Sequence, residues 1–240
     1  MKTRFYERTA YRLSDEPVPN CFLKLDDHFD ARFESGQGAP MGVGLALAES
    51  VCARMADVEM YAYLMQDAVK RHDLARENIG RDADVKAAVM GRSFFIGYLG
   101  AARALLDSGA ATLAILYQLP LTNAERTYAS SAFWQQLVVR EPNVHRRYHA
   151  QRLFFNQALH WCNETPARIP PVSVLQYQFG EFSRRELLMQ VVDDGDADLE
   201  QLATHSYALH WIDPVDLHRR WKVKLLTLCE KLCRDIELNT

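Results

Sequence analysis

The chain has 240 residues, of which 48% are hydrophobic and 25% are charged, and its formal net charge is −3. A chain of this size can bury a sizeable core without disulfides or structural metals, and the composition is that of a folded globular protein. The balance of 28 basic against 31 acidic residues excludes binding of nucleic acid or membranes through overall charge, so any such partner must meet a local patch.

Residues 1–40 lack helical periodicity, and we expect them to form an N-terminal arm packed on the body. Cys21-Phe22-Leu23-Lys24-Leu25 is compatible with a strand. The first eight residues carry charges throughout and no apolar segment, which predicts a cytoplasmic protein without a secretory signal. The residues of the arm that disfavour helix are Pro17, Pro19, Gly36, Gly38 and Pro40.

Two long helices are predicted next, because apolar residues recur at steps of three and four. The first extends over about 41–78. The second extends from Val85 to Leu116, and Pro120 ends it. Only Arg92 interrupts its apolar stripe. Small residues in the second helix, among them Gly97 and Gly100, allow a neighbouring helix to approach closely. We expect the two to form a long antiparallel hairpin at the centre of a bundle.

Arg103 and Asp107 lie four residues apart within the most apolar stretch of the sequence, 93–121. A charged pair at that depth would be costly in lipid. The stretch therefore predicts a buried core helix and no membrane partner. We expect the two side chains to pair with each other inside the protein.

Three further helices follow. One covers 122–140 and begins with the capping-box spacing Thr-Asn-Ala-Glu, and the next covers 143–163 with Asn143 as its cap. The last begins at Asp213, with Pro214 in its first turn. Between the second and third of these helices, the residues at 172–179 alternate in polarity as those of a strand do.

The predicted fold class is mainly all-α: a long antiparallel helical hairpin within a helical bundle, with a small β element. The predicted domains are the arm, 1–40, and one helical-bundle domain, 41–240. We expect the β element to be formed by pieces of 1–35 and 168–182.

Two motifs that resemble ligand loops fail on inspection. Gly42-Val43-Gly44 lacks a preceding strand and has Leu47 where a phosphate loop needs its third glycine. The acidic residues of 194–200 alternate as calcium ligands do, but an EF-hand loop would need glycine at Leu199 and glutamate at His205. We predict an acidic surface loop there and no cofactor.

The five cysteines are odd in number and scattered, which does not indicate a disulfide framework. Cys229 and Cys233 share one face of the last helix and are predicted to be buried core thiols. His145 and His149 also share a helix face, but two arginines lie between them and disfavour a dication. We predict no metal site. The cysteines are Cys21, Cys52, Cys162, Cys229 and Cys233.

A basic cluster between residues 140 and 152 is the candidate binding surface. Tyr148 and Phe154 lie among its members and are able to stack on bases. Such a cluster either holds phosphates or forms a solvated face paired with carboxylates, and the sequence leaves both open. The basic members are Arg140, His145, Arg146, Arg147, His149 and Arg152.

Three motifs in order resemble a known family. Ser-Phe-Phe at 93–95 with Ala-Leu-Leu-Asp-Ser at 104–108 is followed by Ala-Phe-Trp-Gln-Gln-Leu at 132–137 and by Arg-Ile-Pro-Pro at 168–171. This order resembles members of the HEPN superfamily, helical nucleotide-binding domains of prokaryotic toxins and defence systems. The resemblance covers about 84–175.

Active members of that superfamily are metal-independent ribonucleases with an R-x(4–6)-H motif. The resemblance implies that Arg140 holds phosphate charge and that His145 moves the proton of a 2′-hydroxyl attack. It also implies a homodimer and a protein partner such as an antitoxin. Pro142 breaks the helix that should present both groups, and Ala167-Arg168 stands where relatives of this type place a histidine.

We therefore expect a catalytically degenerate protein that binds RNA or a nucleotide. The expected binding residues are Arg146, Arg147, Tyr148, His149 and Arg152. Two alternatives stay open: a homodimeric interaction or scaffold protein without catalytic activity, and an enzyme of another class whose site the sequence does not reveal.

Overall fold

The computed structural model of the chain describes residues 6, 11, 17–36, 42–78, 81–168, 175–179, 182–186, 188–192 and 209–240. Helix dominates these residues, which confirms the predicted fold class. The chain divides into two compact units, described separately below. The first is Met1–Met60, Ala101–Leu159 and Lys222–Thr240, and the second is Tyr61–Gly100 and His160–Trp221. The expected division into an arm and one bundle domain stays a prediction.

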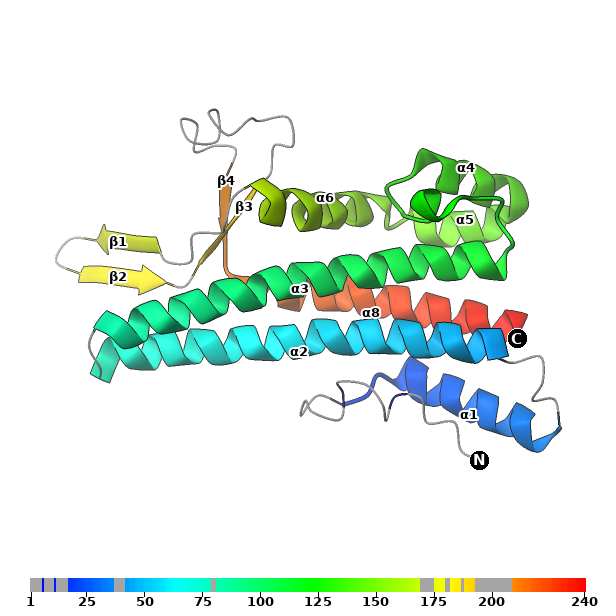
Figure 1. Cartoon of the computed structure of the whole chain (residues 1–240), viewed down its shortest axis with the longest axis horizontal. Coiled ribbons are helices and arrows are strands. Elements are labelled where there is room, and N and C mark those ends of the chain that lie inside the picture. Colours follow the sequence, from blue (N-terminus) through cyan, green and yellow to red (C-terminus); the bar gives the residue numbers. More distant parts are fainter. Residues whose placement is uncertain are drawn as a thin grey trace. The chain divides into compact units, whose positions relative to one another are not determined.

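Helices α2 (Gly42–Asn78) and α3 (Arg81–Leu116) confirm the two long helices (Figure 1). Most of their predicted inward residues are buried, including Cys52, Met55, Phe95 and Leu99.

Helix α1 (Asn20–Glu34) corrects the expectation that 1–40 is non-helical and that 21–25 is a strand. Its buried residues Phe22, Leu25 and Phe29 follow steps of three and four, so a short apolar stripe specifies the helix. The expected helix breakers flank α1 and do not interrupt it: Pro19 lies at its N-cap, and Gly36 follows its end with φ 78°.

The predicted helix over 122–140 is shorter than expected. Thr122 and Glu125 do form the capping interaction, with the Thr122 N–H donating to Glu125 Oε2 at 2.9 Å. That cap begins only a 3₁₀ turn, η4 (Asn123–Glu125). Helix α4 (Ser131–Arg140) starts later, where the Ser130 hydroxyl accepts the N–H of Phe133.

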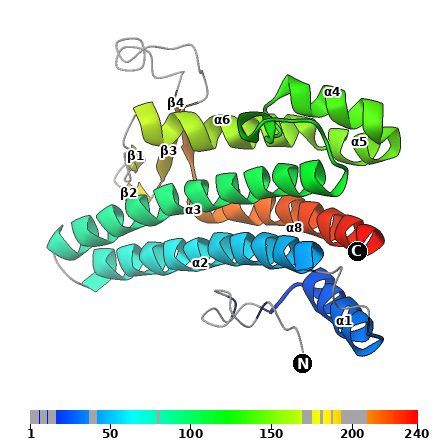
Figure 2. The same ribbon diagram turned by 45° about the vertical axis from the view of Figure 1, so that its right-hand side comes forward.

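The predicted helix over 143–163 is two helices, α5 (Pro142–His149) and α6 (Arg152–Arg168) (Figure 2). Glu141, not Asn143, occupies the N-cap position of α5, because Pro142 fits the first turn, where no N–H partner is needed.

Helix α8 (Pro214–Asn239) has the predicted cap, since Asp213 Oδ1 accepts the N–H of Val215 at 2.8 Å. The inward stripe of α8 is buried as predicted, and so are Cys229 and Cys233.

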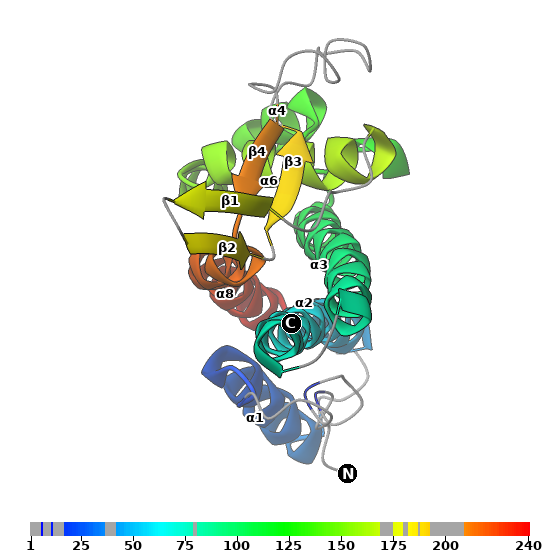
Figure 3. The ribbon, with the colours of Figure 1, turned by 90° about the vertical axis from the view of Figure 1, so that its left-hand side faces the viewer.

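The second unit contains two antiparallel strand pairs (Figure 3). They are β1 (Leu175–Phe179) with β2 (Phe182–Glu186), and β3 (Met189–Val192) with β4 (Leu209–Ile212). The expected origin of the β element was wrong in part, because residues 20–34 are helical and β3 and β4 come from later in the chain. Residues 169–171 and 193–200, where a turn and an acidic loop were predicted, lie outside the described residues.

In the first unit, α2, α3 and α8 contact one another. Lys222 on α8 pairs with the buried Glu59 on α2 at 3.2 Å, and Ser50 on α2 hydrogen-bonds Ser108 on α3 at 3.0 Å. In the second unit, aromatic rings form the core: Tyr98 lies 6.1 Å from Trp221, measured between ring centroids, and Trp161 stacks on the same indole.

The predicted ion pair between Arg103 and Asp107 forms at 3.5 Å, but it is not buried. The two side chains are 53% and 40% exposed, so α3 turns this pair to the surface.

The segment Lys86–Leu116 of α3 is long and apolar enough to cross a membrane, with a mean hydropathy of 1.3. In its most apolar window, 56% of the residues are buried inside the protein.

Gly97 and Gly100 of α3 provide a matched test of close helix packing. A Cβ at Gly97 would overlap the Tyr61 ring of α2, whereas a Cβ at Gly100 would meet nothing within 4 Å. We expect Gly97→Ala to lower the free energy of unfolding by about 1 kcal/mol or more, because the energetic cost of the overlap with Tyr61 exceeds the energetic gain from the higher helix propensity of alanine. Gly100→Ala should raise it by up to about 1 kcal/mol. Urea denaturation measures both, and equal stabilisation by the two changes would contradict the packing.

Candidate nucleic-acid interface

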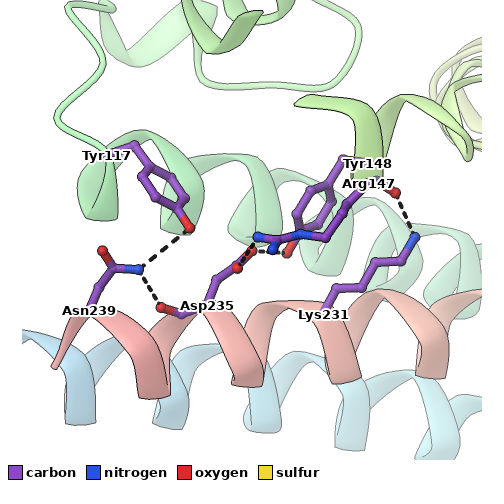
Figure 4. Close-up of polar contacts among 6 residues, drawn as sticks. All are labelled: Tyr117, Arg147, Tyr148, Lys231, Asp235 and Asn239. Atoms are coloured by element: carbon purple, nitrogen blue, oxygen red, sulfur yellow. Dashed lines mark hydrogen bonds and ion pairs between the residues drawn. The ribbon is translucent and has the colours of Figure 1, made fainter. Parts of the chain in front are cut away.

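One face of α5 is fixed to α8 by a buried carboxylate. Asp235 on α8 is fully buried, and its two oxygens accept from adjacent residues of α5. The Arg147 guanidinium forms an ion pair with Oδ1, and the Tyr148 hydroxyl donates to Oδ2 at 2.7 Å (Figure 4). A buried charge needs such partners, because its desolvation is otherwise uncompensated.

Further contacts surround this pair. Lys231 Nζ donates to the carbonyl oxygen of Arg147 at 2.8 Å (Figure 4), and burial together with the Arg147 charge lowers the pKa of Lys231. Burial above all, with Tyr128 and Asp235 adding to it, raises the pKa of Tyr148 well above its usual value. The Tyr148 phenol therefore stays protonated and remains a donor to the carboxylate.

The Asp235 contacts change the expected roles of two candidate residues. Arg147, which was expected to bind RNA, is instead paired with Asp235, and its side chain is only 33% exposed. The Tyr148 ring is fully buried, so it is not available to stack on a base. These two residues position α5.

Two histidines of α5 pack on an indole. The ring of Trp134 on α4 meets His145 and His149 edge-on, with centroid distances of 5.9 and 5.7 Å. The Arg152 guanidinium lies 5.6 Å from the Trp134 ring centroid, in cation–π geometry. Trp134 Nε1 donates to the Tyr128 carbonyl at 2.7 Å, which fixes the indole. We call Trp134, His145, His149 and Arg152 the outer cluster.

Two exposed arginines accompany the outer cluster in sequence: Arg140 ends α4, and Arg146 lies between the two histidines on α5. Within the part of the chain that the structure describes, no carboxylate lies within 4 Å of Arg140, Arg146 or Arg152.

Five surface arginines elsewhere do have carboxylate partners, whereas the exposed Arg234 of α8, like these three, has none among the described residues. Those of α2, α3 and α8 that form ion pairs do so with an aspartate one turn away; they are Arg54, Arg71, Arg103, Arg219 and Arg220. The alternative of a solvated face paired with carboxylates therefore does not describe Arg140, Arg146 and Arg152.

The positive charge also acts on the histidines. Partial burial lowers the pKa of His145, and the neighbouring His149 and Arg152 lower it further. Unpaired cations that disfavour one another's charge form a site that an anion would stabilise. The arrangement is thus suited to phosphate binding, with planar groups beside the charges.

The expected catalytic pair is not brought together by a contact. Arg140 and His145 belong to different helices, separated at Pro142, and the His145 ring contacts Trp134 and His149. No group of three His, Cys, Asp or Glu in the described residues is placed to hold a metal ion. The absence of a metal in solution stays a prediction.

Sequence reasoning missed Asp235 and Trp134. Asp235 follows Leu232 by three residues, on the inward face of α8. A charged residue at such a position predicts a buried partner, and this was the available sign. Trp134 was noted only within the motif at 132–137, and nothing in that motif indicates contact with α5.

Compared with protein-family models, curated proteins and solved structures, the chain has no match. The resemblance to the HEPN superfamily therefore rests on the sequence motifs alone.

The attachment of α5 to α8 is tested by Tyr148→Phe, which removes one hydroxyl and keeps the ring. We expect the free energy of unfolding to fall by about 1.5–3 kcal/mol, the usual value of a hydrogen bond to a charged group. Arg146→Ala on the same helix is the control and should change stability by less than about 0.5 kcal/mol. Urea denaturation measures both variants. Similar small effects would show that the Asp235 contacts do not hold the helix.

Proposed function

We propose that the protein binds RNA or a nucleotide through the outer cluster and the adjacent Arg140 and Arg146, without cleaving it. The observation that carries the proposal is the packing of two histidines and Arg152 on the Trp134 indole, with Arg140 and Arg146 close in sequence. Among the described residues, none of these three arginines has a carboxylate partner. Guanidinium groups bind phosphate oxygens through charge-assisted hydrogen bonds. The sequence resemblance to a nucleotide-binding superfamily supports the same ligand class.

In this proposal the exposed arginines and the planar side chains of the outer cluster bind different parts of the RNA. Arg140 and Arg146 bind phosphates, because both side chains are exposed and have no carboxylate partner among the described residues. The planar groups of His145, His149 and Arg152 contact bases, as aromatic and guanidinium planes do in single-stranded RNA recognition. A single strand fits better than a duplex, since its bases are unstacked and accessible.

The proposal places the protein in the cytoplasm as a homodimer, in a toxin–antitoxin or defence system with a protein partner. The second candidate is a homodimeric interaction protein without a nucleic-acid ligand. It is favoured by two apolar side chains next to the arginines, Val139 and Leu153, which are 75% and 88% exposed.

Charge reversal at Arg140 and Arg146 tests the binding surface. We expect Arg140→Glu with Arg146→Glu to abolish binding of a fluorescent single-stranded RNA and to leave the melting temperature nearly unchanged. Arg147 is left intact because its pairing with Asp235 would confound the result. Wild-type affinity should fall steeply with salt, with a log–log slope of about −0.7 for each phosphate contact.

The control is Arg54→Glu with Arg103→Glu, which makes the same change in net charge at ion-paired surface arginines. It should bind RNA almost as the wild type does. Equal loss of RNA affinity in both double variants would show that net charge alone causes the effect. If the wild type binds no RNA at low salt, the interaction protein is favoured instead.

A cleavage assay tests the absence of catalysis. We expect wild-type protein to leave single-stranded RNA intact in the presence of EDTA, because Arg140 and His145 belong to separate helices and His145 packs on Trp134. His145→Ala should behave identically. Cleavage by the wild type that disappears in His145→Ala would show an active metal-independent ribonuclease.

A further inference from the structure

Cys21 lies in the first turn of α1, where backbone N–H groups lack helical partners. Such groups stabilise a thiolate. The side chain is partly exposed, so the sulfur at this helix start is open to small reagents.

A second thiol contacts the first. Cys233, on α8, is nearly fully buried and lines the same pocket as Cys21. The interaction between the two thiols is the main cause that lowers the pKa of Cys21, and with burial it raises the pKa of Cys233. Of the two thiols, Cys21 therefore loses its proton more readily than Cys233 does.

Both sulfurs line a partly open pocket of about 370 Å³ between α1 and α8. Two basic residues, Lys24 and Arg234, and two acidic residues, Glu230 and Glu237, also line it. Glu230 opposes thiolate formation at Cys21. Cys52 and Cys229 are fully buried and do not line the pocket. Burial raises the pKa of Cys229, so that thiol is inert by comparison.

We propose that Cys21 and Cys233 form a peroxide-sensitive thiol pair, in which Cys21 is the nucleophile and Cys233 resolves it to a disulfide that joins α1 to α8. The site is distinct from the outer cluster, and the proposal does not depend on RNA binding.

The reaction proceeds in two steps. The Cys21 thiolate attacks one oxygen of hydrogen peroxide, the O–O bond breaks, and a sulfenic acid and hydroxide form. The Cys233 sulfur then attacks the Cys21 sulfur. The S–S bond forms as the S–O bond breaks, and the Cys233 proton leaves with the hydroxide as water. Two thiols are oxidised, and one peroxide is reduced to two waters.

The test is mass spectrometry of the reduced full-length protein after hydrogen peroxide treatment, alkylation and digestion. We expect a peptide pair linked through Cys21 and Cys233, lighter than the two thiol peptides by two hydrogen atoms. The control Cys162→Ser changes a buried thiol on α6 and should give the same linked pair.

Two variants separate the steps. In Cys233→Ser, the Cys21 sulfenic acid should persist and be trapped by dimedone, and in Cys21→Ser neither the disulfide nor a dimedone adduct at Cys233 should form. Recovery of Cys21 and Cys233 as alkylated thiols from peroxide-treated wild type would overturn the proposal. So would a disulfide from Cys21 to Cys52 or Cys229, or a Cys233→Ser protein without the adduct.

Discussion

The buried carboxylate of Asp235 is the constraint on which the arrangement of the candidate interface depends. An ionised carboxylate without solvent must be paired and hydrogen-bonded, and here α5 supplies both partners from adjacent residues. Turning Arg147 and Tyr148 toward α8 fixes the rotation of α5 about its own axis. His145 and His149 then meet the Trp134 ring on another side of the helix. The buried ion pair of Arg147 with Asp235 therefore also orients the two histidines of the outer cluster.

This division of α5 into two faces explains how like charges come to lie close together. Six basic residues between 140 and 152 would repel one another on a free helix. One of them, Arg147, is neutralised by Asp235, and Arg152 is held over an indole. Burial is the main cause that lowers the pKa of His145, and repulsion from His149 and Arg152 lowers it further. An anion would relieve this repulsion, which is the physical basis of the proposed function.

The sequence predicts the long helices well because their stripes are local. Steps of three and four identify α2, α3 and α8, and the Asp213 cap places the start of α8. Helix α1 was missed because its flanking breakers were weighed above a stripe of only three buried residues. The predicted capping contact between Thr122 and Glu125 forms, but the helix expected to follow it is only a short turn. A cap satisfies the N–H groups of one turn and does not set the length of a helix.

Ion pairs show the limit of sequence reasoning more clearly. The spacing of Arg103 and Asp107 fixes their contact but not the side of α3 on which they lie, and they prove exposed. The pair of Arg147 with Asp235 joins residues 88 apart in sequence, so no local pattern specifies it. The candidate site was therefore located correctly as a basic segment, but its split into positioning and surface residues needs the tertiary structure.

The most direct test of RNA binding at the outer cluster is the pKa of the His145 imidazole, followed by NMR with and without a short single-stranded RNA. A phosphate bound at the outer cluster stabilises the charged imidazole, so we expect the pKa of His145 to rise on RNA addition and binding to strengthen as pH falls. The same titration of the Arg140→Glu, Arg146→Glu protein should show no rise. An unchanged His145 pKa in wild type under saturating RNA would contradict the proposed interface.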